Sequence, residues 1–200
     1  HQLSDFVNKG FIVLALDGEE NGSIWPVWDA MRTAEEQDLP NPDLDLFDLA
    51  VDCISAHLAV DRSRIYVTGK SAGGIMTNYV LQRRSHLVAG GLISSGIFEF
   101  TTPIPAVPLD PMVVLVTWGG DNDQWNGQAG DGPSVNANFV EQSAVSSAFY
   151  EQAEGVNQAH CHGKDLGHAW LASINDWMAD FLIAHPKGMT ENPEYVFASP

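Results

Sequence analysis

The sequence is poor in basic residues. Lysine and arginine together number 9, against 26 aspartate and glutamate residues, and the formal net charge is -17 at pH 7. A negative field of this size repels nucleic acid and anionic lipid, so neither nucleic acid nor a membrane is an expected partner. A neutral or weakly charged substrate, small or polymeric, is expected instead, and the composition leaves the oligomeric state open.

Long hydrophobic runs and cysteines are also scarce. The longest apolar runs, FIVLAL (11–16) and MVVLV (112–116), fall far short of the roughly 20 residues that a membrane-spanning helix needs. Cys53 and Cys161 are too few for a disulfide-rich scaffold, and either a disulfide between them or two buried free thiols would fit. His160 and His162 flank Cys161, but no further ligand lies at a zinc-binding spacing, so no metal is expected.

What is present is an alternation of apolar, β-branched runs with segments of helical period. The runs FIVLAL, RIYVTG, LVAGGLIS, PMVVLVTWG and VNQAHC are typical of strands, and 43–58, 72–84, 139–154 and 170–184 are typical of helices. This alternation predicts an α/β fold with a mostly parallel, doubly wound sheet and helices on both faces. The strand runs are almost wholly apolar, as expected where helices cover both faces of a sheet.

The domain organisation is predicted to be simple. Residues 1–184 should form one domain, followed by a surface tail at 185–200 that is rich in Pro, Asn and Glu. No internal repeat or linker divides the chain. Three long connections, at 17–41, 96–108 and 119–138, are predicted to be loops, and loops of this length in a compact domain are usually functional or disordered.

A serine stands between a predicted strand and a predicted helix. VTGKSAGG contains the pattern G-x-S-x-G around Ser71. A sharp turn there lifts the hydroxyl clear of the sheet and directs the backbone N–H of Ala72 toward the oxyanion that forms after attack. Gly69 and Gly73 are expected because side chains there would collide across so tight a turn. The pattern predicts Ser71 as a nucleophile and Ala72 as an oxyanion donor, and it assigns Lys70 no role.

A base and an orienting carboxylate should follow in the chain order Ser, Asp, His. His168, in DLGHAW, comes after a strand-like run and before a helix, where a base would lie at the carboxyl end of a late strand. The run VVLVTWGGDND offers two acids, Asp123 and Asp121. Asp123 is the favoured acid, partly because of the resemblance described next, and the other aspartate would cap a turn.

The elbow, the late strand followed by aspartate and the late Gly-His occur in the order found in α/β-hydrolases. More narrowly, VDRSRIYVTGKSAGGIMTNYVL resembles the secreted serine esterases grouped as polyhydroxybutyrate depolymerases and feruloyl esterases. Their pattern is roughly D-x-x-R-[VI]-Y-V-T-G-x-S-A-G-G-x-M, which Asp61, Arg64 and Tyr66 match together with the elbow. Support continues in SSG (94–96) and in GHAW around His168.

This resemblance implies hydrolysis of feruloyl, acetyl or polyhydroxyalkanoate-type esters through an acyl-enzyme. Ser71 would be the nucleophile, His168 the general base and then acid, and Asp123 the residue that holds the imidazole. The resemblance implies no metal or organic cofactor, and a secreted or periplasmic location. Trp25 and Trp28 resemble tryptophans of the family and would line the acyl or aromatic pocket, although packing at the surface accounts for them almost equally well.

The resemblance also has a gap. In this fold a strand with an H-G loop, which supplies the second oxyanion N–H, precedes the run FIVLAL and lies beside RIYV in the sheet. The sequence holds no such strand, so the numbering is expected to begin inside a larger domain, with His1 to Lys9 as the end of a helix. Two alternatives to an esterase are an oligopeptidase of the same fold and an inactive, hydrolase-like binding module.

Overall fold

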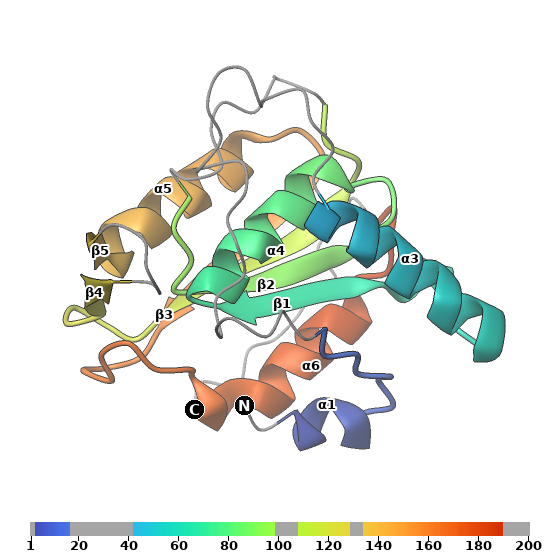
Figure 1. Cartoon of the computed structure of the whole chain (residues 1–200), viewed down its shortest axis with the longest axis horizontal. Helices are drawn as coiled ribbons and strands as arrows, with labels where there is room; N and C mark the ends of the chain where they lie inside the picture. Colours follow the sequence, from blue (N-terminus) through green and yellow to red (C-terminus); the bar gives the residue numbers. More distant parts are fainter. Residues whose placement is uncertain (1–2, 17–41, 99–107, 129–133, 190–200) are drawn as a thin grey trace.

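The computed structural model describes residues 3–16, 42–98, 108–128 and 134–189. Figure 1 shows a central sheet with helices packed on both sides. The helices and strands are α1 (Ser4–Asn8), α3 (Pro42–His57), β1 (Tyr66–Lys70), α4 (Ala72–Arg83), β2 (Gly90–Ser94), β3 (Met112–Trp118), β4 (Gln124–Gln128), β5 (Ser134–Asn138), α5 (Phe139–Gln152), β6 (Val156–His162) and α6 (Asn175–Ala184).

Four strands form the central sheet in the order β1-β2-β3-β6, and each neighbouring pair is parallel. The side chains of β3 alternate between two hydrophobic clusters. Val114 and Val116 pack with residues of α3, α4 and α5, whereas Val113 and Leu115 pack with residues of α1 and α6. Helices therefore cover both faces of the sheet, and the predicted α/β fold is confirmed.

One predicted strand is wrong. Residues 11–16, FIVLAL, have no regular secondary structure, and the side chains of Ile12 and Leu14 are about half exposed. A strand is stable only when a neighbouring strand takes up its backbone hydrogen bonds. Among the strands that the structure describes, none pairs with this segment. Apolar composition without a partner therefore leaves the segment irregular.

The connection at 119–138, predicted to be a loop, contains a hairpin. β4 and β5 pair antiparallel, with Trp125 opposite Ala137. Their sequences, QWNGQ and SVNAN, are mostly polar, so a search for apolar runs misses them. The last helix also begins later than predicted, at Asn175, after a 3-10 turn at 172–174. The connection at 17–41 and most of the one at 96–108 lie outside the described residues.

The part of the predicted tail that the structure describes packs against the domain. His185 is buried, and its Nδ1–H donates to the carbonyl of Phe181 (2.6 Å). The backbone N–H of Lys187 donates to Ser63 O (2.7 Å), and its Nζ donates to Ser85 O (2.6 Å). Residues 190–200 lie outside the described residues, so the domain boundary at 184 stays a prediction.

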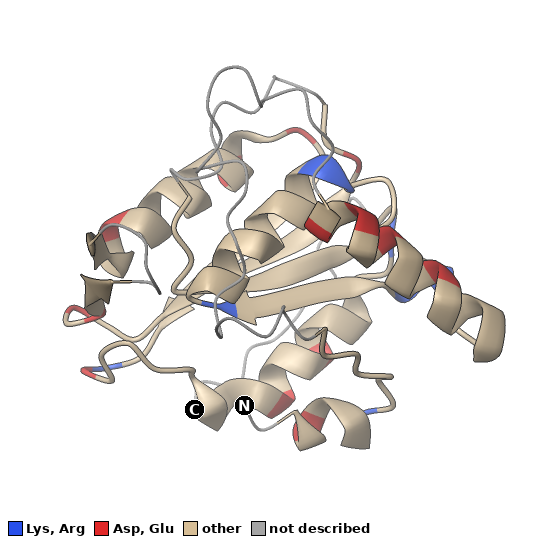
Figure 2. Ribbon diagram, viewed as in Figure 1, with Lys and Arg blue, Asp and Glu red and all other residues tan. Residues whose placement is uncertain are grey.

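Acidic residues gather along α3 (Figure 2). Asp48 accepts from Arg84 Nε at 2.9 Å, and Asp52 accepts from Arg62 Nη2 at 2.7 Å. Ion pairs on an exposed face add little to stability, so the outer face of this helix is chiefly a charged surface, while Leu44 and Phe47 on its inner face pack in the core. In the parts of the chain that the structure describes, no helix is long and apolar enough to cross a membrane.

Candidate active site

Ser71 forms the turn between β1 and α4. Its φ of 58° and ψ of -119° are uncommon for a residue with a side chain. Two backbone hydrogen bonds hold this conformation: Ser71 N–H donates to Ser94 O on β2 (2.9 Å), and Ile75 N–H donates to Ser71 O (3.0 Å). The serine thus lies at the carboxyl edge of the sheet, on a tight strand-to-helix turn.

The two glycines of the G-x-S-x-G pattern have different surroundings. A Cβ on Gly69 would lie 2.2 Å from the carbonyl oxygen of Gly73, so no side chain fits at that position. A Cβ on Gly73 would meet no described atom within 4 Å. The expectation that a side chain on Gly73 would collide is therefore wrong, because the crowding acts on the first glycine alone.

Asp123 lies in the turn between β3 and β4, and its side chain is 0% exposed. Its Oδ2 accepts from Ser95 Oγ and from Gly119 N–H, each at 2.7 Å, and its Oδ1 lies 2.9 Å from Nδ1 of His168. Burial alone would raise the pKa of this carboxyl, but the hydrogen bonds from His168, Gly119 and Ser95 outweigh it and hold the pKa below its usual value. Asp123 is therefore a fixed, ionised acceptor.

His168 comes from the loop between β6 and α6. Its Nδ1–H donates to Asp123, which leaves the lone pair of Nε2 free to accept a proton. One face of the imidazole stacks on the ring of Phe139, with ring centroids 4.3 Å apart and an interplanar angle of 11°. Since His168 follows β6 and Ser71 follows β1, both belong to the carboxyl edge of the same parallel sheet.

Backbone contact between two glycine-containing loops brings Asp123 and His168 together. A Cβ on Gly119 would lie 1.6 Å from the carbonyl oxygen of Gly167, the residue before His168. Leu166 N–H donates to Gly119 O, and Gly163 N–H donates to Trp118 O, each at 2.8 Å. The loop after β3 and the loop after β6 therefore lie directly on each other, with no room for a side chain at Gly119.

The other predicted site residues lie as follows. Ala72 is the first residue of α4, so its N–H is one of the donors for which a helix offers no internal partner. Asp121 is exposed in the turn before Asp123, whereas Trp25 and Trp28 lie outside the described residues. Burial lowers the pKa of the Lys70 ammonium, and the charge of Asp123 offsets this in part.

Sequence reasoning missed two residues at this site. Ser95, buried and with a φ of 47°, donates to Asp123, and Phe139 covers the imidazole. Ser95 did carry a signal, because it directly follows a strand at the edge where the other site residues lie. Phe139 carried no signal in the sequence. Its contact with His168, 29 positions later in the chain, forms only because the start of α5 meets the loop between β6 and α6 in the fold.

Within the described ranges, on β6 or elsewhere, no group of three or more His, Cys, Asp or Glu side chains could hold a metal ion. The exposed rings of His160 and His162 lie beside Trp118, with centroids 6.0 and 5.0 Å away. Cys53 and Cys161 are free thiols rather than a disulfide, and Cys53 is exposed, not buried. Burial raises the pKa of Cys161 to about 11, which keeps that thiol protonated.

Residues 1–128 match the model of the prolyl oligopeptidase family. The matched region includes Ser71 and Asp123 and ends before His168. Two relatives are an oxidized polyvinyl alcohol hydrolase of Pseudomonas sp. and acetylxylan esterase A of Emericella nidulans. The first is 28% identical over an alignment of 221 positions that covers 87% of this chain and 58% of the relative. The second is 26% identical over 147 residues, 73% of this chain and 42% of the relative.

A similar solved structure is the crystal structure of native pOPH. It has a TM-score of 0.68 and 28% sequence identity, over 80% of this chain and 60% of that one. The chain thus spans about three fifths or less of the length of these relatives. The comparisons support the resemblance to α/β-hydrolases, whereas the narrower resemblance to depolymerases and feruloyl esterases stays a proposal.

Proposed function

This chain belongs to the prolyl oligopeptidase family of α/β-hydrolases, and from that premise we propose that it hydrolyses carboxylic esters through a covalent acyl-enzyme. Ser71 Oγ attacks the ester carbonyl while Nε2 of His168 takes its proton. The protonated imidazole then donates that proton to the leaving alcohol, and water releases the acyl group by the same steps in reverse. Asp123 holds the imidazole, and the N–H of Ala72 stabilises the oxyanion.

One observation carries this proposal. The carboxylate of Asp123, fully buried and with three donors, lies 2.9 Å from Nδ1 of His168 at the sheet edge where Ser71 occupies its tight turn. Burying a charge costs free energy unless hydrogen bonds compensate for the lost water. An apolar side chain would fill the same space without this cost, so the buried carboxylate indicates a role beyond packing. Orienting a base for a nucleophile explains why the acid, the histidine and the serine all come from strand ends.

The proposed substrates are acetyl, feruloyl or polyhydroxyalkanoate-type esters. The names of the two relatives, an esterase acting on acetylated xylan and a hydrolase acting on oxidized polyvinyl alcohol, favour acyl groups that belong to a polymer. Trp25 and Trp28 are proposed to line the acyl pocket. The mechanism uses no metal or organic cofactor, and the proposed location is secreted or periplasmic.

Two other functions remain as alternatives. The name of the matched family makes an oligopeptidase the second candidate, in which the same residues would cleave amides. A hydrolase-like binding module without turnover is the third. Parallel assays with p-nitrophenyl acetate and with a peptidyl p-nitroanilide separate the first two, and covalent labelling by a fluorophosphonate separates both from the third.

The decisive experiment measures p-nitrophenyl acetate hydrolysis by the chain and by its Ser71→Ala variant. We expect turnover and fluorophosphonate labelling in the chain, and neither in the variant, because the hydroxyl is the atom acylated. Faster p-nitroanilide than ester cleavage would favour the oligopeptidase. Equal activity in both proteins would remove Ser71 from the mechanism, and a folded chain that is neither active nor labelled would favour the binding module.

A further inference from the structure

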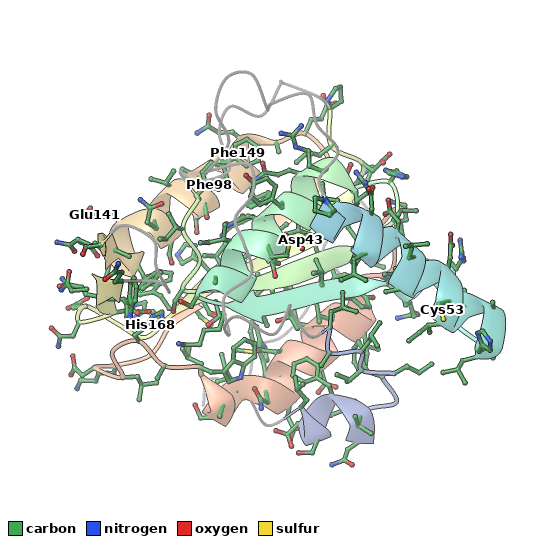
Figure 3. All side chains as sticks on the ribbon, in the orientation of Figure 1. Asp43, Cys53, Phe98, Glu141, Phe149 and His168 are labelled. Carbon is green, nitrogen blue, oxygen red and sulfur yellow. The ribbon has the colours of Figure 1, made fainter. Side chains whose placement is uncertain are left out.

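Phe139 touches two members of the proposed triad. It is the first residue of α5 and is 2% exposed, and its backbone N–H donates to the carbonyl oxygen of Asp123 at 3.0 Å. Its ring lies 4.3 Å from the imidazole of His168 and is almost parallel to it. Figure 3 labels His168 near the end of α5 where that helix meets β5. One residue thus fixes the acid through its backbone and covers the base with its side chain.

The stacked contact has an electrostatic consequence that an aliphatic side chain would not provide. The face of an aromatic ring carries partial negative charge and attracts a cation that lies over it. A neutral imidazole gains little from this attraction, whereas an imidazolium gains considerably more. In acyl transfer the imidazole of His168 becomes protonated in the transition state, so the ring acts most strongly when the reaction needs it.

We propose that Phe139 is a positioning residue whose ring stabilises the imidazolium of His168 during acyl transfer. This inference rests on the proposed function, because it needs His168 to accept a proton. Asp123, from the β3–β4 turn, pairs with the imidazole, and Lys70, from the end of β1, acts on the charge of Asp123. The other charged groups on the elements around the imidazole are Asp121 of the same turn, Glu141 of α5, and Lys164 and Asp165 of the loop that carries His168. None of these groups is removed when the ring of Phe139 is replaced.

The test compares three substitutions. Phe139→Leu keeps an apolar side chain but removes the π face, and Phe139→Tyr keeps the face. Phe149→Leu is the matched control, since Phe149 belongs to the same helix and packs against Phe98, with ring centroids 4.9 Å apart, away from His168. Figure 3 shows the labels of Phe149 and His168 toward opposite ends of α5. Phe139→Met is a second variant without a π face, in case leucine prevents folding.

The first readout is the acid dissociation constant of His168, followed by proton NMR and assigned by its absence in His168→Ala. Cation–π attraction of roughly 0.5–2 kcal/mol corresponds to a roughly 2- to 30-fold change in this constant. Removing the face should raise the constant in Phe139→Leu, because the imidazolium loses the attraction of the ring. Phe139→Tyr and Phe149→Leu should leave it near its original value.

The second readout is the pH profile of kcat/KM for p-nitrophenyl acetate. We expect Phe139→Leu to lower the plateau by a similar factor and to move the acid limb to lower pH, whereas Phe139→Tyr restores both. A loss of packing alone would lower the plateau without that movement. An unchanged dissociation constant in a folded Phe139→Leu or Phe139→Met overturns the proposal. The ring current of Phe139 should also shift the ring protons of His168 upfield in the unmodified chain, and the absence of that shift overturns the proposal as well.

The NMR titration also separates the two levels of inference. It reads the imidazole whether or not the chain turns over an ester. If the dissociation constant shifts as expected while fluorophosphonate labelling and hydrolysis both fail, the contact with the ring is real and the proposed function is wrong. If labelling and hydrolysis succeed while the constant stays fixed, the esterase proposal stands and the role of Phe139 is wrong.

Discussion

Two regions of the molecule differ in which side chains they bury. The first is the carboxyl edge of the sheet, and the second is the outer surface formed by α3 and the N-terminal segment 11–16. In neither region does the polarity of a side chain decide whether it is buried. At the sheet edge, a charged residue, Asp123, is 0% exposed and has three hydrogen-bond donors. On the outer surface, Leu49 of α3 is 67% exposed and Ile12 is 50% exposed. The polar group is buried and the apolar groups are not.

The difference lies in how each region is constrained. At the edge, hydrogen bonds and backbone contacts hold Asp123 in place, because a misplaced partner would leave a buried charge unsatisfied. On the outer surface, exposed leucine side chains change the free energy of unfolding little, whether they are kept or replaced. Substitutions at the edge should therefore change activity strongly, and substitutions on the outer surface should change almost nothing.

The largest effect is expected at Asp123. Asp123→Asn keeps the shape but offers an amide to Nδ1 of His168, which favours the wrong tautomer and no longer balances the imidazolium. We expect kcat to fall on the order of 10⁴-fold. Asp121→Asn, in the exposed part of the same turn, should change kcat less than about twofold, in line with surface substitutions. Equal losses in the two variants, measured with p-nitrophenyl acetate, would contradict the assignment of the acid.

Gly119→Ala tests the contact between the two loops. Its Cβ would lie 1.6 Å from the backbone carbonyl oxygen of Gly167, and only a shift of one of the two loops can relieve this clash. A displacement of about 1 Å costs on the order of 100-fold in rate, so we expect at least that loss in kcat/KM. Gly73→Ala is the control, because its Cβ would meet no described atom within 4 Å. Since alanine favours a helix more than glycine does, this variant should have an unchanged or higher melting temperature. Full activity in Gly119→Ala would show that the loops need no close contact.

Ser95→Ala removes one of the three donors to Asp123 without disturbing the others. A hydrogen bond to a charged group contributes roughly 1.5–3 kcal/mol, so we expect kcat to fall by at least about 10-fold. Ser146→Ala, which removes another buried serine hydroxyl from α5, should leave kcat unchanged. If both serine variants behave alike in kcat and in thermal unfolding, the hydroxyl of Ser95 only fills space.

The sequence predicted the elements of the centre well, and the reason is physical. Strands β2 and β3 lie in the middle of the sheet with helices on both faces, so their buried positions are largely apolar residues that can be recognised in the sequence. FIVLAL carries the same signal, but pairing depends on a neighbour and not on composition. The hairpin of β4 and β5 shows the opposite error, since paired strands with polar sequences leave no apolar run to detect.

The site was predictable where chemistry requires a local motif and hidden where it depends on tertiary contact. Ser71 stands in a pattern set by the geometry of one turn, and His168 and Asp123 follow strand ends in a fixed order. The donors Ser95 and Gly119, and the ring of Phe139, meet these residues only because separate loops converge. No spacing along the chain encodes that convergence.

The smallest effect is expected on the outer surface, at Leu49. Leu49→Gln replaces an apolar side chain that is mostly in water, so the free energy of unfolding should change by less than about 0.5 kcal/mol. Leu44→Ala on the same helix is the control: Leu44 is 5% exposed and packs in the core, and its loss should destabilise the chain by roughly 2–5 kcal/mol. Urea denaturation measures both. A large loss of unfolding free energy in Leu49→Gln would mean that this surface is buried in the protein in solution, because only a side chain removed from water contributes that much stability. The outer surface would then no longer be an exposed region to set against the sheet edge.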